Sequence, residues 1–145
     1  MKVLIQRVAK AQVDIDGKTV GKINQGILAL IGIEKSDTND KADKLLKKII
    51  SYRLFPDNHD KMNLSLQDIK GELLLVSQFT LVADTQKGLR PSFSSAASPM
   101  LSQELYDYLV KQALTTGLRI QTGVFAANMQ VTLINDGPVT FNLQC

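Results

Sequence analysis

The six residues Asn135-Asp136-Gly137-Pro138-Val139-Thr140 lie between two segments that both alternate apolar and polar residues in the manner of strands. The first segment covers residues 129–134, and the second covers residues 139–143. This arrangement predicts a hairpin with the six residues as its turn. Asp136-Gly137 suits such a turn, because glycine adopts positive φ angles without a Cβ clash.

Pro138 is the unusual residue of this predicted turn. It has no N–H for the strand ladder, and it restricts the backbone of Gly137. A cis bond before proline costs only about 0.5–1 kcal/mol relative to trans, and it would direct two neighbouring carbonyl oxygens the same way, as a pair of acceptors. The local residues alone favour the simpler alternative, a tight turn with a trans proline.

Strand patterns recur along the rest of the chain. They predict strands at residues 2–8, 11–15, 19–23, 26–33, 72–81 and 118–122. Asp16-Gly17 supplies a second hairpin turn between two of these strands. The segment at residues 26–33 is an almost unbroken apolar run, which indicates a strand buried on both faces.

Two segments have the helical period instead. In residues 36–55 the apolar side chains fall on one face opposite lysines, and we expect the lysine face to be solvated. The predicted N-cap of this helix is Asp37, Asn39 or Asp40. A second helix is predicted to begin with Ser98 as its N-cap and Pro99 as its first residue, and to end at Gly117.

These elements together indicate an α+β fold. The 145 residues fit a single domain, 1–145, long enough to bury roughly 68–70% of the surface that its unfolded chain exposes. Many strands joined by hairpins predict a mostly antiparallel sheet that tends to close into a barrel. The two main helices are expected to pack on that sheet.

Composition narrows the class of protein. Hydrophobic residues make up 44% of the chain, and no apolar run approaches the roughly 20 residues that span a bilayer. The first eight residues show no secretion signal, so a cytoplasmic location is expected. The single cysteine, Cys145, excludes an internal disulfide. A net charge of +3 tolerates a polyanionic partner without requiring one.

A polar segment, Ser77-Gln78-Phe79-Thr80, follows the apolar run of the strand predicted at residues 72–81. Polar groups at the end of a core strand lie where pockets tend to form. The alternative is that these side chains only cap nearby backbone groups. Taken by themselves, the four residues favour that alternative.

Other candidate residues have equally simple structural interpretations. In the loop at residues 87–99, Arg90-Pro91-Ser92-Phe93 indicates either a phosphate or ribose contact beside an aromatic ring, or a surface turn. Arg7 is either a surface residue or a ligand contact. The pattern favours core packing for Phe125 and Met129. The one histidine, His59, has no partner at helical spacing and is interpreted as a loop residue.

Taken together, Ser77-Gln78-Phe79-Thr80 and the stretch from Asn135 to Thr140 closely resemble the two signature motifs of the D-aminoacyl-tRNA deacylases. The resemblance extends along the whole chain. Supporting segments are Ile5-Gln6-Arg7-Val8, Lys61-Met62-Asn63, Arg90-Pro91-Ser92-Phe93, and Thr122-Gly123 with Phe125 and Met129. Asn128 and Asp60 depart from the family pattern, where Asp and Gly are expected, but both lie outside the two signatures.

The resemblance implies a homodimer that hydrolyses the ester between a D-amino acid and the terminal adenosine of tRNA. It implies catalytic roles for Ser77, Gln78, Phe79 and Thr80, without a metal or other cofactor. It also implies that Gly137 and Pro138 are joined in cis and enter the partner's pocket. Phe125, Met129 and Arg7 are then expected to contribute to substrate binding, and Arg90 and Ser92 to meet the tRNA.

Such a site would select the D enantiomer by exclusion. With the α-ammonium and the ester both fixed, an L side chain would meet the protein wall and a D side chain would point to solvent. Glycine has no side chain to clash, so glycyl-tRNA is predicted to be cleaved as well. Either Thr80 or the ribose 2′-OH would assist the attack, because His59 is poorly placed for a Ser-His-Asp triad.

Two other functions compete with this hypothesis. A non-catalytic RNA-binding module would suit the mild basicity, but it normally exposes stacking aromatics, and this chain has few aromatics outside core-like positions. A small-molecule D-amino-acid esterase or amidase would act on esters that lack RNA. Assays on aminoacyl-tRNA and on RNA-free esters would separate the three.

Overall fold

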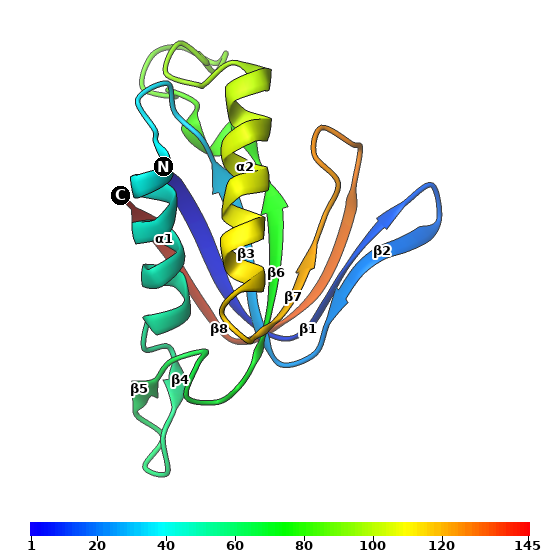
Figure 1. Cartoon of the computed structure of the whole chain (residues 1–145), viewed down its shortest axis with the longest axis vertical. Helices are drawn as coiled ribbons and strands as arrows, with labels where there is room; N and C mark the ends of the chain where they lie inside the picture. The colour runs from blue at the N-terminus through cyan, green and yellow to red at the C-terminus, as the bar shows by residue number, and fades with distance from the viewer.

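The computed structural model describes residues 1–145, and its sheet is organised around one long strand. Strand β1 (Lys2–Ile15) joins the two strands that the sequence predicts separately. Strand β8 (Gln130–Gln144) runs antiparallel along nearly the whole of β1. Both strands bend together midway, as Figure 1 shows.

The predicted hairpin turn at residues 135–140 is therefore wrong. Both halves of β8 pair with β1, Asn135 with Val8 and Thr140 with Gln6. The residues between them, 136–139, form a bulge in a continuous strand opposite Arg7, which we call the Gly-Pro bulge. The Gly137–Pro138 peptide bond is cis, unlike the trans bond that the local residues favour.

The other edge of β1 is shared by two strands. Strand β3 (Gly26–Gly32) pairs with its first half and β2 (Lys18–Ile23) with its second half, both antiparallel. Strands β6 (Glu72–Ser77) and β7 (Arg119–Thr122) then extend the sheet from β3 in parallel. Parallel neighbours need a crossover connection, and the two helices lie in these crossovers.

Both predicted helices are present, with one corrected cap. Helix α1 (Asn39–Ser51) buries its apolar face, and its N-cap is Thr38, without a side-chain cap bond, rather than any of the three predicted residues. Asp37 instead accepts hydrogen bonds from the Glu34 N–H and from the Met1 ammonium group. Helix α2 (Pro99–Leu114) has the predicted Ser98 cap, whose Oγ accepts from the Leu101 N–H at 3.3 Å.

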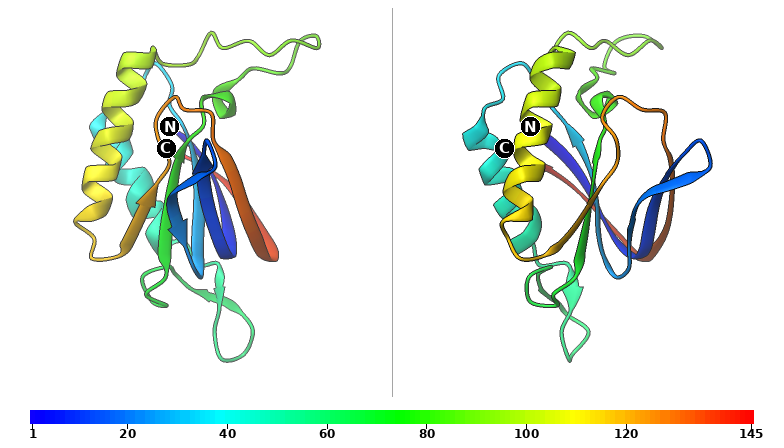
Figure 2. Two further views of the ribbon diagram at one scale, coloured as in Figure 1. Left: turned by 90° about the vertical axis from the view of Figure 1, so that its right-hand side faces the viewer. Right: turned by 45° about the vertical axis from the view of Figure 1, so that its right-hand side comes forward.

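The sheet has two buried faces. Figure 2 shows both helices on one face, where the larger core lies. The other face curls on itself around a smaller core that includes Val8, Val13 and Leu74. The curl brings β2 against β7, and a Cβ on Gly21 would lie only 2.4 Å from the Thr122 carbonyl oxygen. The predicted α+β fold with a barrel-like sheet is confirmed.

Short elements complete the chain. Strands β4 (Phe55–Pro56) and β5 (Met62–Leu64) form a small hairpin around the loop that contains His59. The 3-10 helix η1 (Phe79–Val82) takes up most of the last four residues of the strand predicted at 72–81, so that strand ends at Ser77. Neither helix is long and apolar enough to cross a bilayer.

Candidate active site

The carboxyl ends of the parallel strands β3 and β6 create the main opening in the molecule. The Gln78 N–H donates to the Ile31 carbonyl at 2.7 Å, which continues the parallel pairing one residue beyond β6. The chain then turns into η1, and this turn lifts Phe79 and Thr80 out of the sheet and exposes both. The polar segment predicted from the sequence therefore lies at a strand end beside open space.

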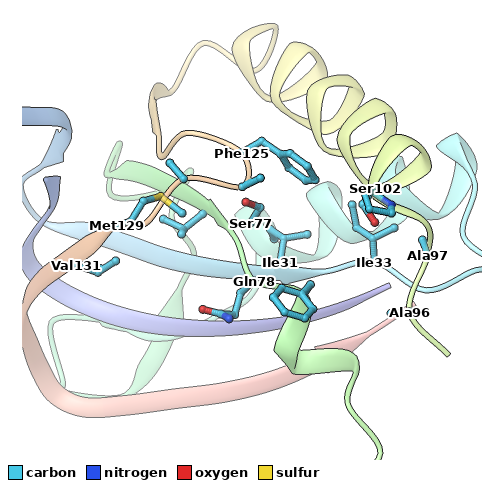
Figure 3. Close-up of a pocket in the computed structure, with 15 residues that line it drawn as sticks. Ile31, Ile33, Ser77, Gln78, Ala96, Ala97, Ser102, Phe125, Met129 and Val131 are labelled. Atoms are coloured by element: carbon cyan, nitrogen blue, oxygen red, sulfur yellow. The ribbon is translucent and has the colours of Figure 1, made fainter. Parts of the chain in front are cut away.

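A cavity of about 470 Å³ lies against this segment (Figure 3). Its volume is within the range of sites that bind small molecules. Eleven of its fifteen lining residues are hydrophobic, so the cavity suits a largely apolar ligand with a few polar groups. The wall comes from β3, the end of β6, the segment before α2 with its first turn, and residues 125–131, and includes Ile31, Ile33, Ser77, Gln78, Phe79, Ala96, Ala97, Ser102, Phe125, Met129 and Val131.

Contacts among the polar and aromatic residues fix the rim of this cavity. The Gln78 amide Nε2 donates to the Thr80 hydroxyl oxygen, so the two side chains hold each other in place. The Phe79 ring packs against Phe93 with their centroids 5.0 Å apart. Phe79 is nevertheless 61% exposed, which leaves most of its ring free to contact a ligand.

The opposite wall is anchored by one backbone carbonyl. The Leu75 oxygen accepts from the buried Tyr106 hydroxyl at 2.8 Å and from the Gly123 N–H at 2.9 Å. These bonds tie α2 and the start of the residue 123–129 loop to β6. Burial raises the pKa of Tyr106, so its hydroxyl stays protonated and donates over the ordinary pH range.

Phe125 and Met129 lie on that loop and face the cavity (Figure 3). Both are half-buried, and each also packs against one of the two cores. The pattern that favours pure core packing is therefore incomplete, because both side chains form ligand-accessible walls as well. A Cβ on Gly123 would lie 2.6 Å from the Met129 sulfur, so Gly123 is what lets that side chain approach β6.

The Gly-Pro bulge is held by Arg7. The Arg7 Nε donates to the Asp136 carbonyl at 2.8 Å, and Nη1 donates to the Leu54 carbonyl at 2.7 Å. The Asp136 carboxylate lies 3.3 Å from the same Nε. Arg7 is thus a largely buried anchor rather than a surface residue, and it leaves Gly137 and Pro138 exposed on the bulge.

The two predicted parts of the site do not meet within one chain. Arg7 pairs with Ile27 at the start of β3, whereas Ile31 and Ile33 line the cavity at its far end. Four to six residues of strand separate these points by roughly 13–20 Å. The cavity and the Gly-Pro bulge are therefore at opposite ends of the sheet.

The remaining candidate residues lie outside the cavity. Arg90 is exposed near the tip of a projecting loop, and Ser92 pairs with Asp84 at the base of that loop. His59 lies in the β4–β5 hairpin, where its backbone N–H donates to the Asp57 carboxylate. The Asn63 amide, with the His59 and Lys61 N–H groups, lowers the pKa of Asp57. No group of three His, Cys, Asp or Glu side chains is arranged to hold a metal ion.

Several wall residues have no local signal in the sequence. Ile31 and Ile33 look like ordinary core residues, and Ser102 looks like a helix surface residue. They become part of the site only because the crossovers bring the end of β3 and the start of α2 to the same edge. The Leu54 carbonyl, which accepts from Arg7, is equally invisible in sequence because it is a backbone group.

Comparisons with known proteins identify relatives along nearly the whole chain. The family model for D-Tyr-tRNA(Tyr) deacylase matches residues 4–144. The D-aminoacyl-tRNA deacylase of Pseudoalteromonas translucida is 62% identical over 143 residues, which are 99% of each chain. That of Haemophilus influenzae (strain KW20) is 60% identical over 141 residues, which are 97% of each chain.

Solved structures show the same fold. The c-Myc DNA Unwinding Element Binding Protein superposes with a TM-score of 0.94 at 37% identity, over 100% of this chain and 99% of that one. A probable eukaryotic D-amino acid tRNA deacylase superposes with a TM-score of 0.85 at 15% identity, over 99% and 98% of the two chains. The sequence matches and the shared fold place this chain in the D-Tyr-tRNA(Tyr) deacylase family.

Proposed function

We propose that this protein hydrolyses the ester between a D-amino acid and the terminal adenosine of tRNA. The observation that carries the proposal is the apolar cavity directly against Ser77, Gln78 and Phe79. Its relatives named D-aminoacyl-tRNA deacylases match nearly the whole chain. The direct test is release of D-tyrosine from D-tyrosyl-tRNA, with L-tyrosyl-tRNA as the comparison and an RNA-free D-tyrosine ester as a test for a small-molecule esterase.

The cavity suits the terminal adenosine. A purine ring is flat and largely apolar, and Phe79 and Phe125 offer aromatic surface on which it can stack. The ester would then lie at the rim near Thr80. The N–H groups of Phe79 and Thr80 start η1, where the first N–H groups have no partner within the helix and Gln78 provides no side-chain cap. These two N–H groups are our candidates to stabilise the tetrahedral oxyanion, with about 2.7–4 kcal/mol from each donor.

Completion of the site requires a second copy of the chain. The exposed Gly-Pro bulge is roughly 13–20 Å along the sheet from its own cavity, so it suits the cavity of a partner. Mixing Gly137→Ala with Gln78→Ala subunits tests this directly. In a mixed dimer, one cavity is intact and faces an intact bulge, so activity should return; no recovery would contradict a shared site.

Chiral selection follows from that shared site. We infer that carbonyl oxygens of the Gly-Pro bulge bind the substrate's α-ammonium group while the ester is held at the rim. An L side chain then points into the wall, and a D side chain points to solvent. Glycyl-tRNA should therefore be cleaved as well. Glycyl esters as resistant as L-alanyl esters would contradict this steric explanation.

The attacking group is inferred from what surrounds Thr80. Its hydroxyl accepts from the Gln78 amide, which is not a base, and the only histidine lies in the β4–β5 hairpin. An unassisted hydroxyl is a weak nucleophile. The ribose 2′-OH beside the ester is the better candidate to assist the attack. Thr80→Ala should then retain most of its turnover, while a 2′-deoxy terminal adenosine should abolish it.

A further inference from the structure

A projecting loop next to the cavity carries Arg90 and Ser92, which the family resemblance associates with tRNA, but none of its residues lines the cavity. We call residues 84–92 the finger loop. Two backbone hydrogen bonds close its base. The Asp84 N–H donates to the Ser92 carbonyl at 2.8 Å, and the Ser92 N–H donates to the Asp84 carbonyl at 2.9 Å. Gly88, with φ +71°, helps to turn the chain at the tip. Figure 2 shows this part of the chain extending away from both the sheet and the helices.

The tip of the finger loop is cationic and partly apolar. Lys87 and Arg90 are exposed, and neither forms an ion pair with a carboxylate. Leu89 between them is fully exposed. The one acidic residue, Asp84, lies at the base and accepts from the Gln86 N–H. Two free cations beside an apolar side chain are suited to contact phosphates and adjoining sugars or bases.

The finger loop is connected to the cavity by an aromatic pair. Ser92 at its base is followed by Phe93, and the Phe93 ring packs on Phe79 at the cavity rim. Leu89 at the tip is four residues from Phe93, a reach of at most about 14 Å. A stacked strand of nucleic acid advances about 3.4 Å per nucleotide. The tip therefore reaches the first few nucleotides beyond a ligand held in the cavity.

We propose that the finger loop binds phosphates of the single-stranded 3′ end of tRNA, immediately before the terminal adenosine, through Lys87 and Arg90. This inference rests on the proposed function, because it needs the terminal adenosine in the cavity. A membrane surface is the competing partner for a tip with two cations and a leucine. The finger loop joins the cavity rim through Phe93, and that continuity favours RNA.

Salt dependence of binding tests the inference. For single strands, log K falls with log salt by about 0.7 for each phosphate contacted. Binding of deacylated tRNA should therefore lose about 1.4 from this slope in the double variant Lys87→Gln/Arg90→Gln. Between 50 and 200 mM salt, the wild type should lose about sevenfold more affinity than the variant. Fluorescence anisotropy with labelled tRNA measures both quantities.

Three controls decide the outcome. Lys44→Gln/Lys47→Gln removes the same charge from the exposed face of α1 and should keep the wild-type slope. Lys87→Arg/Arg90→Lys should keep it as well, because both charges remain. A tRNA that lacks its last four nucleotides should bind the wild type and the Gln variant with equal slopes. An equal loss of slope in the α1 variant, or a difference that persists on the shortened tRNA, would overturn the inference.

Two further measurements separate this inference from the proposed function. The ratio of kcat/KM for D-tyrosyl-tRNA to that for D-tyrosyl-adenosine should be lower in the Gln variant than in the wild type, because only the tRNA substrate carries the phosphates that the finger loop contacts. Binding to vesicles of phosphatidylserine that depends on Leu89, without a change in the tRNA slope, would overturn the inference.

The Gln variant's loss of affinity for tRNA is greatest at low salt, where counterion release contributes most to binding. The fall in this ratio at 50 mM salt should therefore exceed the fall at 200 mM by about sevenfold. A fall that is the same at both salt concentrations would overturn the inference. If the wild type cleaves neither ester, the proposed function is wrong, and the binding slopes on intact and shortened tRNA still decide the role of the finger loop.

Discussion

The two ends of the sheet are built in different ways. At one end, the cavity is formed by loops and strand ends, its rim aromatic Phe79 is 61% exposed, and most of its lining is hydrophobic. At the other end, Arg7 holds the Gly-Pro bulge through a short hydrogen bond to the Asp136 carbonyl and is itself anchored by a second one to the Leu54 carbonyl. Apolar packing at the cavity end tolerates small shifts of the walls, whereas directional, charge-assisted hydrogen bonding defines the position of the bulge.

This difference suits a division of tasks in the proposed reaction. The cavity would supply area and stacking for an adenosine, which tolerates small shifts of its walls. The bulge would decide between enantiomers, which differ only in the direction of one substituent, so it requires a rigid position. Substitutions at the bulge should therefore affect activity more than substitutions of similar size at the cavity.

Gly137→Ala should have the largest effect. A Cβ at this position would lie 2.8 Å from Val139 Cγ2 and 3.2 Å from Arg7 Nη2, at a φ of +134° that L residues rarely adopt. We expect kcat/KM for D-tyrosyl-tRNA to fall about 100-fold, as when a reacting group is displaced by about 1 Å. Gly17→Ala is the matched control, because Gly17 also has positive φ but nothing within 4 Å of its Cβ. An equal fall in both variants would contradict the comparison.

Arg7→Met should have the second-largest effect on kcat/KM. It removes the hydrogen bond to the bulge and the bond that anchors Arg7 itself, so the Asp136 and Leu54 carbonyls both lose this donor. We expect the free energy of unfolding to fall by about 3 kcal/mol, with kcat/KM down more than tenfold. Arg7→Lys should recover only part of both, because an ammonium group lacks the planar fork that serves two acceptors. Urea denaturation and kinetics on the three proteins would check this, and full recovery by lysine would contradict it.

Local signals in the sequence predict most of the elements but not how the two ends are formed. Ser98-Pro99 predicts the start of α2 correctly, because capping depends on neighbours in the chain. Asn135 to Thr140 has every local feature of a hairpin turn, yet it is a bulge, since both of its flanks pair with β1. Strand pairing between residues about 130 positions apart is not encoded in a local pattern.

The site shows the same limit. Ser77 to Thr80 and the Gly137-Pro138 pair are found from their resemblance to family motifs, and Ser77, Gln78 and Phe79 do line the cavity. Ile31 and Ser102 line it too, but their roles depend on crossovers that meet at one edge of the sheet. The separation of the cavity from the Gly-Pro bulge is also a property of the fold alone.

Tyr106→Phe should have a moderate effect at the cavity end. It removes the buried hydroxyl bond to Leu75, while the Gly123 N–H still satisfies that carbonyl. We expect a loss of about 1 kcal/mol in the free energy of unfolding at pH 8. The control is the pH dependence, which an effect of packing alone would not produce.

Burial raises the pKa of Tyr106 in the folded protein, so above pH 10 the unfolded chain loses this proton first. The Tyr106 hydroxyl therefore makes its full contribution to the free energy of unfolding below pH 10. Above pH 10 this contribution decreases, by up to about 1.4 kcal/mol per pH unit. The advantage of the wild type over Tyr106→Phe should disappear near pH 11. Urea denaturation from pH 8 to 11 measures it, and a constant difference would show that the hydroxyl is not sheltered.

Phe93→Ala should have the smallest effect, because Phe93 is 37% exposed and packs on Phe79 at the rim without lining the cavity itself. Loss of a partly exposed aromatic pair corresponds to about 0.5 kcal/mol, or about a twofold fall in kcat/KM. Met100→Ala, an exposed apolar residue nearby in sequence, should leave kcat/KM unchanged. A tenfold fall in Phe93→Ala would mean that Phe93 itself contacts the substrate, and the cavity end would then be as demanding as the bulge.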